Sequence, residues 1–181
     1  MRWLDGIGCV VCGLSPVRRA CPMPIIELST VIRAPRERVF DLARSIDAHR
    51  DSTGGTEERA VAGVTKGLIG MGGEVTWEAR HFGVRQRLSV RVTAFERPMH
   101  FQDAMISGAF SSMIHDHKFE EHPEGTLMLD RFEFASPLGI LGKIADWLFL
   151  TSYMRRFIIR RNAVLKQLAE SGDWSRYVKH A

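Results

Sequence analysis

Cysteine is missing from the chain after residue 21, and its three copies, Cys9, Cys12 and Cys21, all stand near the N-terminus. This absence excludes a disulfide framework for the body of the protein and leads us to expect a reducing, cytoplasmic location. The Cys9–Cys12 pair has the spacing of a redox motif or of half a zinc site, but no second pair follows at zinc spacing. We therefore interpret these cysteines as part of a tail.

Signatures of several large function classes are missing as well. No apolar run approaches the roughly 18 residues of a membrane-spanning helix. The net charge of +4 is small, and no recognised nucleic-acid-reading module accompanies the basic residues, so we expect no nucleic-acid partner. There is no P-loop and no nucleophile elbow, and the glycine-rich stretch at 67–73 lacks the dinucleotide spacing and a following helix. We expect no cofactor.

The chain is long enough for one domain with a core of its own, having 181 residues of which 45% are hydrophobic. Residues 1–22 carry only a weak apolar stretch that glycine and cysteine interrupt, and Met23 stands just before regular patterning begins. We interpret residues 1–22 as a disordered extension or the product of a start site assigned too early. The expected domain spans residues 23–170, with a C-terminal tail at 171–181, in a monomer or a homodimer.

The first part of this domain has the pattern of a strand followed by a helix. Residues 25–32 are rich in β-branched side chains and predict a strand. Pro35 suits the first turn of a helix, and apolar residues then recur at helical spacing through Ile46. A short strand at 57–62 is expected next.

Two hairpins are predicted further along the chain. In the first, strands 74–81 and 84–94 flank a tight turn at Phe82–Gly83. That register makes one face apolar apart from two polar members, His81 and Gln86. The second hairpin pairs strands 110–121 and 126–134, preceded by a strand at 100–106. Its register places His117 opposite Asp130 inside an apolar stripe.

The last part of the expected domain predicts one long helix, because apolar side chains keep a period near 3.6 from residue 140 to residue 168. A helix with such a stripe needs a wide apolar surface to cover, and the hairpins supply one. The predicted fold class is α+β, a helix-grip in which a curved antiparallel sheet wraps around the long C-terminal helix. A small helix follows the first strand.

This order of elements resembles the START-like superfamily, which includes polyketide cyclases/dehydrases, lipid-transfer domains and plant pathogenesis-related allergens. The resemblance runs from residue 25 to about residue 170 and includes Ala34-Pro35 and Val39-Phe40-Asp41-Leu42. Shorter segments look like a bacterial branch labelled SRPBCC family protein: Glu78-Ala-Arg-His-Phe-Gly83, Phe101-Gln-Asp103, Gly108-Ala-Phe110, His115-Asp-His117 and Ser136-Pro-Leu-Gly139. The resemblance implies a cavity between the sheet and the final helix. Members bind lipids, quinones or polyketides, and only some are enzymes.

His117 and Asp130 are the sharpest candidates for a site on the inner face. A carboxylate beside an imidazole raises its basicity, as a general base requires, although buried pairs that only order a hairpin are commoner. His81, Gln86 and His115 would lie nearby. The histidines alternate along a strand and no committed ligand set emerges, so we expect no metal. Further residues could line a ligand pocket or simply form core: Trp77, Phe101, Met113, Phe119, Met128, Phe132 and Trp147.

The final helix is locally basic, with Arg155, Arg156, Arg160 and Arg161. A solvated face is the ordinary interpretation, and weak contact with an anionic membrane surface or ligand headgroup is the alternative. The function we expect is binding or transport of a hydrophobic small molecule, such as a lipid, a quinone or a polyketide-like compound. The alternative is a cyclase/dehydrase-type enzyme with His117 as the base and Asp130 orienting it.

Overall fold

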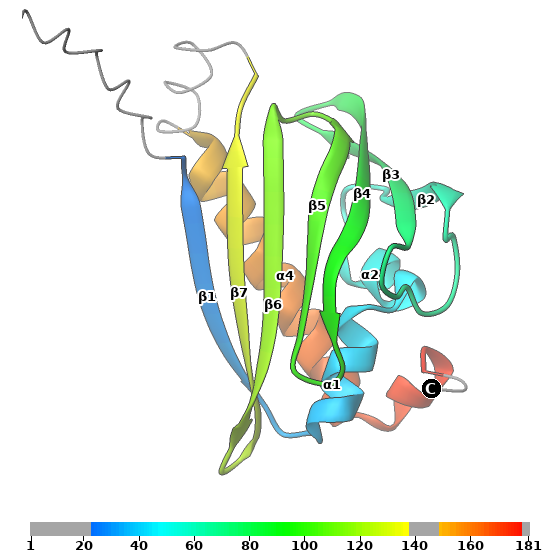
Figure 1. The fold of residues 1–181 in the computed structure, drawn as a ribbon, viewed down its shortest axis with the longest axis vertical. Helices are drawn as coiled ribbons and strands as arrows, with labels where there is room; N and C mark the ends of the chain where they lie inside the picture. Colours follow the sequence, from blue (N-terminus) through cyan, green and yellow to red (C-terminus); the bar gives the residue numbers. More distant parts are fainter. Residues whose placement is uncertain (1–22, 138–148, 179–181) are drawn as a thin grey trace, which may run out of the picture.

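A seven-stranded antiparallel sheet forms the body of the protein (Figure 1). The computed structural model describes residues 23–137 and 149–178. The strands follow the order β1-β7-β6-β5-β4-β3-β2 across the sheet. Their bounds are Ile25–Ile32 (β1), Arg59–Gly63 (β2), Glu74–His81 (β3), Val84–Glu96 (β4), His100–Gly108 (β5), Ser112–His122 (β6) and Gly125–Ala135 (β7).

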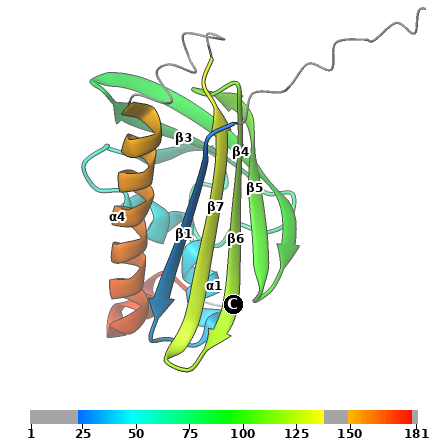
Figure 2. The same cartoon turned by 90° about the vertical axis from the view of Figure 1, so that its left-hand side faces the viewer.

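One long helix and two short ones cover the concave face of this sheet. The long helix, α4 (Thr151–Glu170), runs along the curved sheet, as Figure 2 shows from the side. The short helices α1 (Arg36–Ala43) and α2 (Ile46–Ser52) connect β1 to β2. The predicted helix-grip architecture is therefore confirmed. No described helix has the length and apolar character needed to cross a membrane.

The predicted single helix after β1 is divided into α1 and α2, which corrects the expectation from periodicity. Ser45 adopts an extended backbone conformation between them. Its Oγ accepts a hydrogen bond from the backbone N–H of Ala48 at 3.3 Å. A serine in this position satisfies one of the free N–H groups at the start of a helix, so it begins a new helix and ends the previous one.

Both predicted hairpin registers are confirmed. Trp77 pairs with Leu88 across β3 and β4, and His117 pairs with Asp130 across β6 and β7. The first hairpin turns at Phe82 and Gly83, whose φ angles of 52° and 78° are both positive. That conformation matches the right-handed twist of the two strands, and it leaves Phe82 on the surface.

Two apolar clusters fill the space between the sheet and the helices. One lies under the first turns of α4 and includes Trp77, Met113 and Phe132. The other lies under α1, where the ring of Phe40 makes edge contacts with Phe95, Phe101 and Phe119 at 5.3–5.5 Å between centroids. Most of the cavity wall comes from the first cluster, whereas Phe101 and Ala43 of the second cluster border the cavity at its edge.

The chain after α4 turns back onto the short helices. The 3-10 helix η2 (Gly172–Arg176) brings Trp174 under the guanidinium of Arg38, 4.5 Å from the ring centroid. The Tyr177 hydroxyl donates a hydrogen bond to Asp51 at 3.0 Å. Residues 171–178 thus pack against α1 and α2. Residues 1–22, the predicted helical segment 140–148 with Trp147, and residues 179–181 lie outside the described residues.

Candidate ligand-binding site

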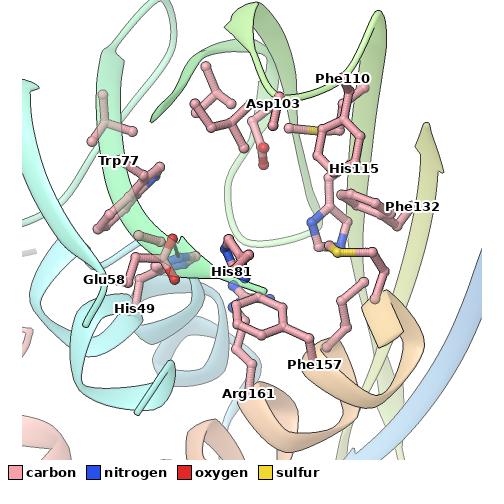
Figure 3. Close-up of a pocket in the computed structure, with 18 of the residues that line it drawn as sticks. His49, Glu58, Trp77, His81, Asp103, Phe110, His115, Phe132, Phe157 and Arg161 are labelled. Carbon is pink, nitrogen blue, oxygen red and sulfur yellow. Dashed lines mark hydrogen bonds and ion pairs between the residues drawn. The ribbon is translucent and has the colours of Figure 1, made fainter. Parts of the chain in front are cut away.

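A cavity of about 350 Å³ opens between the concave face of the sheet and α4. Its walls are mainly apolar and come from β3 to β7, from the short helices α1 and α2, and from α4 (Figure 3). Eight residues that the sequence predicts for the site line this cavity: Trp77, His81, Gln86, Phe101, Met113, His115, His117 and Phe132. The structure therefore brings most of the predicted side chains to one space on the inner face of the sheet.

Three other predicted site residues lie elsewhere in the described part of the chain. Phe119 and Met128 do not border the cavity, because α1 covers that end of the sheet and packs them into the cluster around Phe40. Asp130 is 2% exposed and lies behind the cavity wall. Its contacts nevertheless tie it to the residues that form that wall.

Asp103, His115, His117 and Asp130 form a polar cluster at one end of the cavity. The strand pairing brings them together, since Asp103 lies opposite His115 across β5 and β6 while His117 lies opposite Asp130 across β6 and β7. His117 Nδ1 is 2.9 Å from Asp130 Oδ1, and His117 Nε2 is 3.3 Å from Asp103 Oδ1. The imidazole of His117 therefore bridges two carboxylates.

Asp130 also binds the second histidine and α4. His115 Nε2 is 3.1 Å from Asp130 Oδ1. On the other oxygen, Asn162 Nδ2 donates a hydrogen bond to Asp130 Oδ2 at 2.7 Å. Arg161 Nη1 is 3.8 Å from Asp130 Oδ1, and its Nη2 donates to the backbone oxygen of Ala43 at 3.4 Å. One carboxylate thus links β6, β7 and α4 below the cavity.

Burial and these contacts shift the pKa values of the two histidines in opposite directions. Burial lowers the pKa of His115 to about 4, and the neighbouring His117 acts in the same direction. Burial also opposes the charged form of His117, but its close contacts with the carboxylates of Asp103 and Asp130 outweigh that effect and raise its pKa. Burial would likewise raise the pKa of Asp130, but the two histidines hold it well below the usual range. At neutral pH, His115 is neutral and both carboxylates are charged.

The contact between His117 and Asp130 is what a general base and its orienting carboxylate require. However, the other ring nitrogen of His117, Nε2, faces the carboxylate of Asp103, so it is not free to accept a proton from a ligand. The role of His117 as a base therefore stays a prediction.

A second polar group lies on the opposite side of the cavity in Figure 3 and was not predicted as a unit. His49 stacks on Trp77 with 4.2 Å between ring centroids, and its Nε2 is 3.3 Å from Glu58 Oε1. His81 Nδ1 lies 2.7 Å from the hydroxyl of Tyr153. Glu58 Oε2 is buried and has no hydrogen-bond partner among the described residues.

Sequence reasoning missed residues in segments where the apolar pattern does not show which side chains point into the cavity. Asp103 sits on β5, and the pairing of β5 with β4 shifts register between Ser89 and Val90 and again between Val92 and Ala94. Those irregularities break the alternation from which inward and outward positions are counted. Asn162 follows Arg161 on α4. A polar residue beside the apolar stripe of this helix was a weak sign that its side chain takes part in a buried polar contact.

No family model and no curated protein matches the sequence. Solved structures do match the fold. The protein TTHA0849 from Thermus thermophilus has 19% identity and a TM-score of 0.66, over 80% of this chain and 95% of that one. Major latex-like protein 151 from Panax ginseng has 14% identity and a TM-score of 0.61, over 81% of this chain and 97% of that one. The chain has the START-like helix-grip fold. In this helix-grip domain the cavity lies between sheet and long helix.

Proposed function

We propose that this helix-grip domain binds a hydrophobic small molecule that carries oxygen groups at two ends. The observation that supports the proposal is the cavity of about 350 Å³, whose walls are apolar between two separate polar groups. Ligand sites in proteins have this character, with volumes of ~300–1,000 Å³ and a few placed polar groups. The volume is at the small end of that range and favours a compact molecule.

The polar groups narrow the class of ligand. Glu58 Oε2 has no donor among the described residues, so a ligand hydroxyl would satisfy it. At the other end, Arg161 lines the cavity and its Nη1 is buried without a hydrogen-bond acceptor among the described residues. A ligand carbonyl or phenolate oxygen would accept from it. A ring system with hydroxyl and carbonyl groups, of the quinone or polyketide type, fits these demands better than a long acyl chain.

Filling the cavity tests the proposal. Ala79 is 6% exposed and lines the cavity from β3, so Ala79→Phe places a ring in the ligand's space. Ala104 pairs with Ile114 across β5 and β6 on the other face of the sheet, so Ala104→Phe adds the same ring outside the cavity. We expect wild type and Ala104→Phe to bind the fluorescent naphthalene 1-anilinonaphthalene-8-sulfonate saturably, and Ala79→Phe to lose this binding.

The same titration can refute the proposal. Equal binding by all three folded proteins would show that the probe occupies the surface and that the cavity is not the site. Circular dichroism of each variant establishes that it is folded before the comparison is made.

A further inference from the structure

We propose that Asp103, His115 and His117 together bind a divalent transition-metal ion at the inner end of the cavity. Each of the three offers one ligand atom, and these atoms all lie within 4.8 Å of one another. The expectation that no set of metal ligands emerges missed this group because the facing of Asp103 was not assigned. Two imidazoles and one carboxylate are a donor set that suits Zn²⁺ or Fe²⁺.

The backbone holds the three ligands in place before any ion arrives. His115 and His117 are two residues apart on β6 and point to the same face, with 3.8 Å between ring centroids. Asp103 lies directly opposite His115 on β5. His117 Nε2 and Asp103 Oδ1 are 3.3 Å apart. Two ligands ~2.0–2.2 Å from one tetrahedral metal lie about that far from each other.

The contacts behind the rings select the ring nitrogens that remain for a metal. A carboxylate only accepts hydrogen bonds, so the hydrogen bond between His115 Nε2 and Asp130 requires an N–H group on that nitrogen. The lone pair of His115 then lies on Nδ1. His117 Nε2 faces Asp103 Oδ1 at 3.3 Å, so an ion bound between these two atoms would take the place of a proton there. Metal-binding histidines commonly donate their second N–H to a carboxylate in this way. Asn162 in turn fixes Asp130 through a hydrogen bond of 2.7 Å.

The charge of the surroundings is compatible with a dication. Asp103 and Asp130 bring two negative charges into a site where His115 and His117 are 8% and 2% exposed. Of the described residues, only Arg161 adds a permanent positive charge to this group. Three protein ligands leave a coordination position open toward the cavity, where an oxygen of the bound molecule could enter.

Cobalt binding to the full chain, freed of metal with a chelator, tests this site. Co²⁺ reports on its own coordination through visible d–d absorption. We expect a single saturable equivalent of Co²⁺, displaced by Zn²⁺. We expect Asp103→Asn and His117→Gln each to weaken its binding by at least about 100-fold, since losing even an outer-shell partner costs ~10–100-fold.

A matched control lies on the outer face of the same strands. His100 Nε2 is 2.9 Å from Asp116 Oδ1, which makes a second histidine–aspartate pair on β5 and β6. His100→Gln therefore removes an imidazole of the same kind and should leave Co²⁺ binding unchanged. A chain with Cys9, Cys12 and Cys21 replaced by serine should also bind Co²⁺ as the wild type does.

A second measurement needs no variant. X-ray absorption of the Zn²⁺-loaded wild type should show only nitrogen and oxygen neighbours, with scattering from two imidazoles. Sulfur neighbours, undiminished binding in Asp103→Asn and His117→Gln, or no saturable Co²⁺ binding in the wild type would each overturn the proposal. The metal site stands apart from the cavity proposal, because Ala79→Phe tests the cavity without touching these ligands.

Discussion

Asp130 lies directly opposite His117 in the β6–β7 pairing, with 2.9 Å between Asp130 Oδ1 and His117 Nδ1. The same oxygen is 3.1 Å from His115 Nε2. One buried carboxylate thereby fixes both rings on the cavity wall, and Asn162 fixes the carboxylate from α4. The polar end of the cavity is held by a residue that does not itself border the cavity.

Replacing Asp130 should destabilise the fold more than replacing a similar residue on the outer face. Asp130→Ala removes the carboxylate that pairs with two buried histidines and accepts a hydrogen bond from Asn162, which we expect to cost about 3–5 kcal/mol. Asp116→Ala breaks a partly exposed pair with His100 and a hydrogen bond from Gln102, and should cost about 1 kcal/mol. Urea unfolding of both variants measures the difference. Equal losses would mean that the buried cluster contributes nothing beyond an outer-face pair.

Asp41 should make the fold sensitive to acid. It is 2% exposed, and Arg97 holds both of its oxygens, with Nε 3.1 Å from Oδ1 and Nη2 2.7 Å from Oδ2. Burial opposes its charge, but the hydrogen bonds from Arg97 and Arg44 outweigh burial and lower its pKa. A lowered folded-state pKa contributes stability above the ordinary value of about 3.9, and this stability is lost as the pH falls below it.

The variant Asp41→Asn isolates that effect. We expect it to unfold about 1–2 kcal/mol more easily than the wild type at pH 7, because hydrogen bonds to charged groups are worth ~1.5–3 kcal/mol and Arg97 is partly exposed. Below pH ~4 the gap should narrow, since the wild-type carboxyl then takes up a proton. Thermal unfolding across this pH range measures it, and a gap that does not change with pH would contradict the assignment.

The cluster under α1 should matter for stability and not for ligand binding. Phe40 is fully buried against Phe95, Phe101 and Phe119 and does not line the cavity. Phe40→Ala should cost about 3–5 kcal/mol of unfolding free energy. While the variant remains folded, its affinity for the naphthalene probe should equal that of the wild type. A large fall in affinity would show that the two apolar clusters are coupled.

Glu58 should act as an anchor for the ligand. Its unpaired Oε2 has no donor among the described residues, so Glu58→Gln replaces an acceptor of ligand hydrogen bonds by an amide. We expect a hydroxylated naphthoquinone to bind this variant about 10-fold more weakly, a loss of ~1–2 kcal/mol. The quinone without the hydroxyl should bind wild type and variant alike. Isothermal titration calorimetry compares the two ligands, and an equal loss for both would exclude the anchor role.

The sequence predicted the sheet well because side chains on a strand alternate with a period of two. A slip of one residue in the second hairpin would have turned His117 and Asp130 outward, so the apolar stripe alone defined their pairing. That reasoning gave one half of the polar cluster. The same reasoning could not place Asp103, because the irregular pairing of β4 with β5 interrupts the alternation of inward and outward side chains.

The apolar pattern of the sequence also could not predict how far the cavity extends along the sheet. Trp77 and Phe119 both carry inward-facing rings, but only Trp77 borders the open space. The difference arises from α1, which ends at Ala43 and covers only one end of the sheet. Where a helix stops depends on a local event, here the capping of α2 by Ser45, which periodicity of apolar residues does not register.

The most direct test of the cavity as a ligand site is native mass spectrometry of the protein purified from its own host. We expect the wild type to carry the mass of a small molecule that is released on denaturation, and we expect Ala79→Phe to carry none. A wild-type protein of bare mass that also fails to take up the naphthalene probe would contradict this expectation.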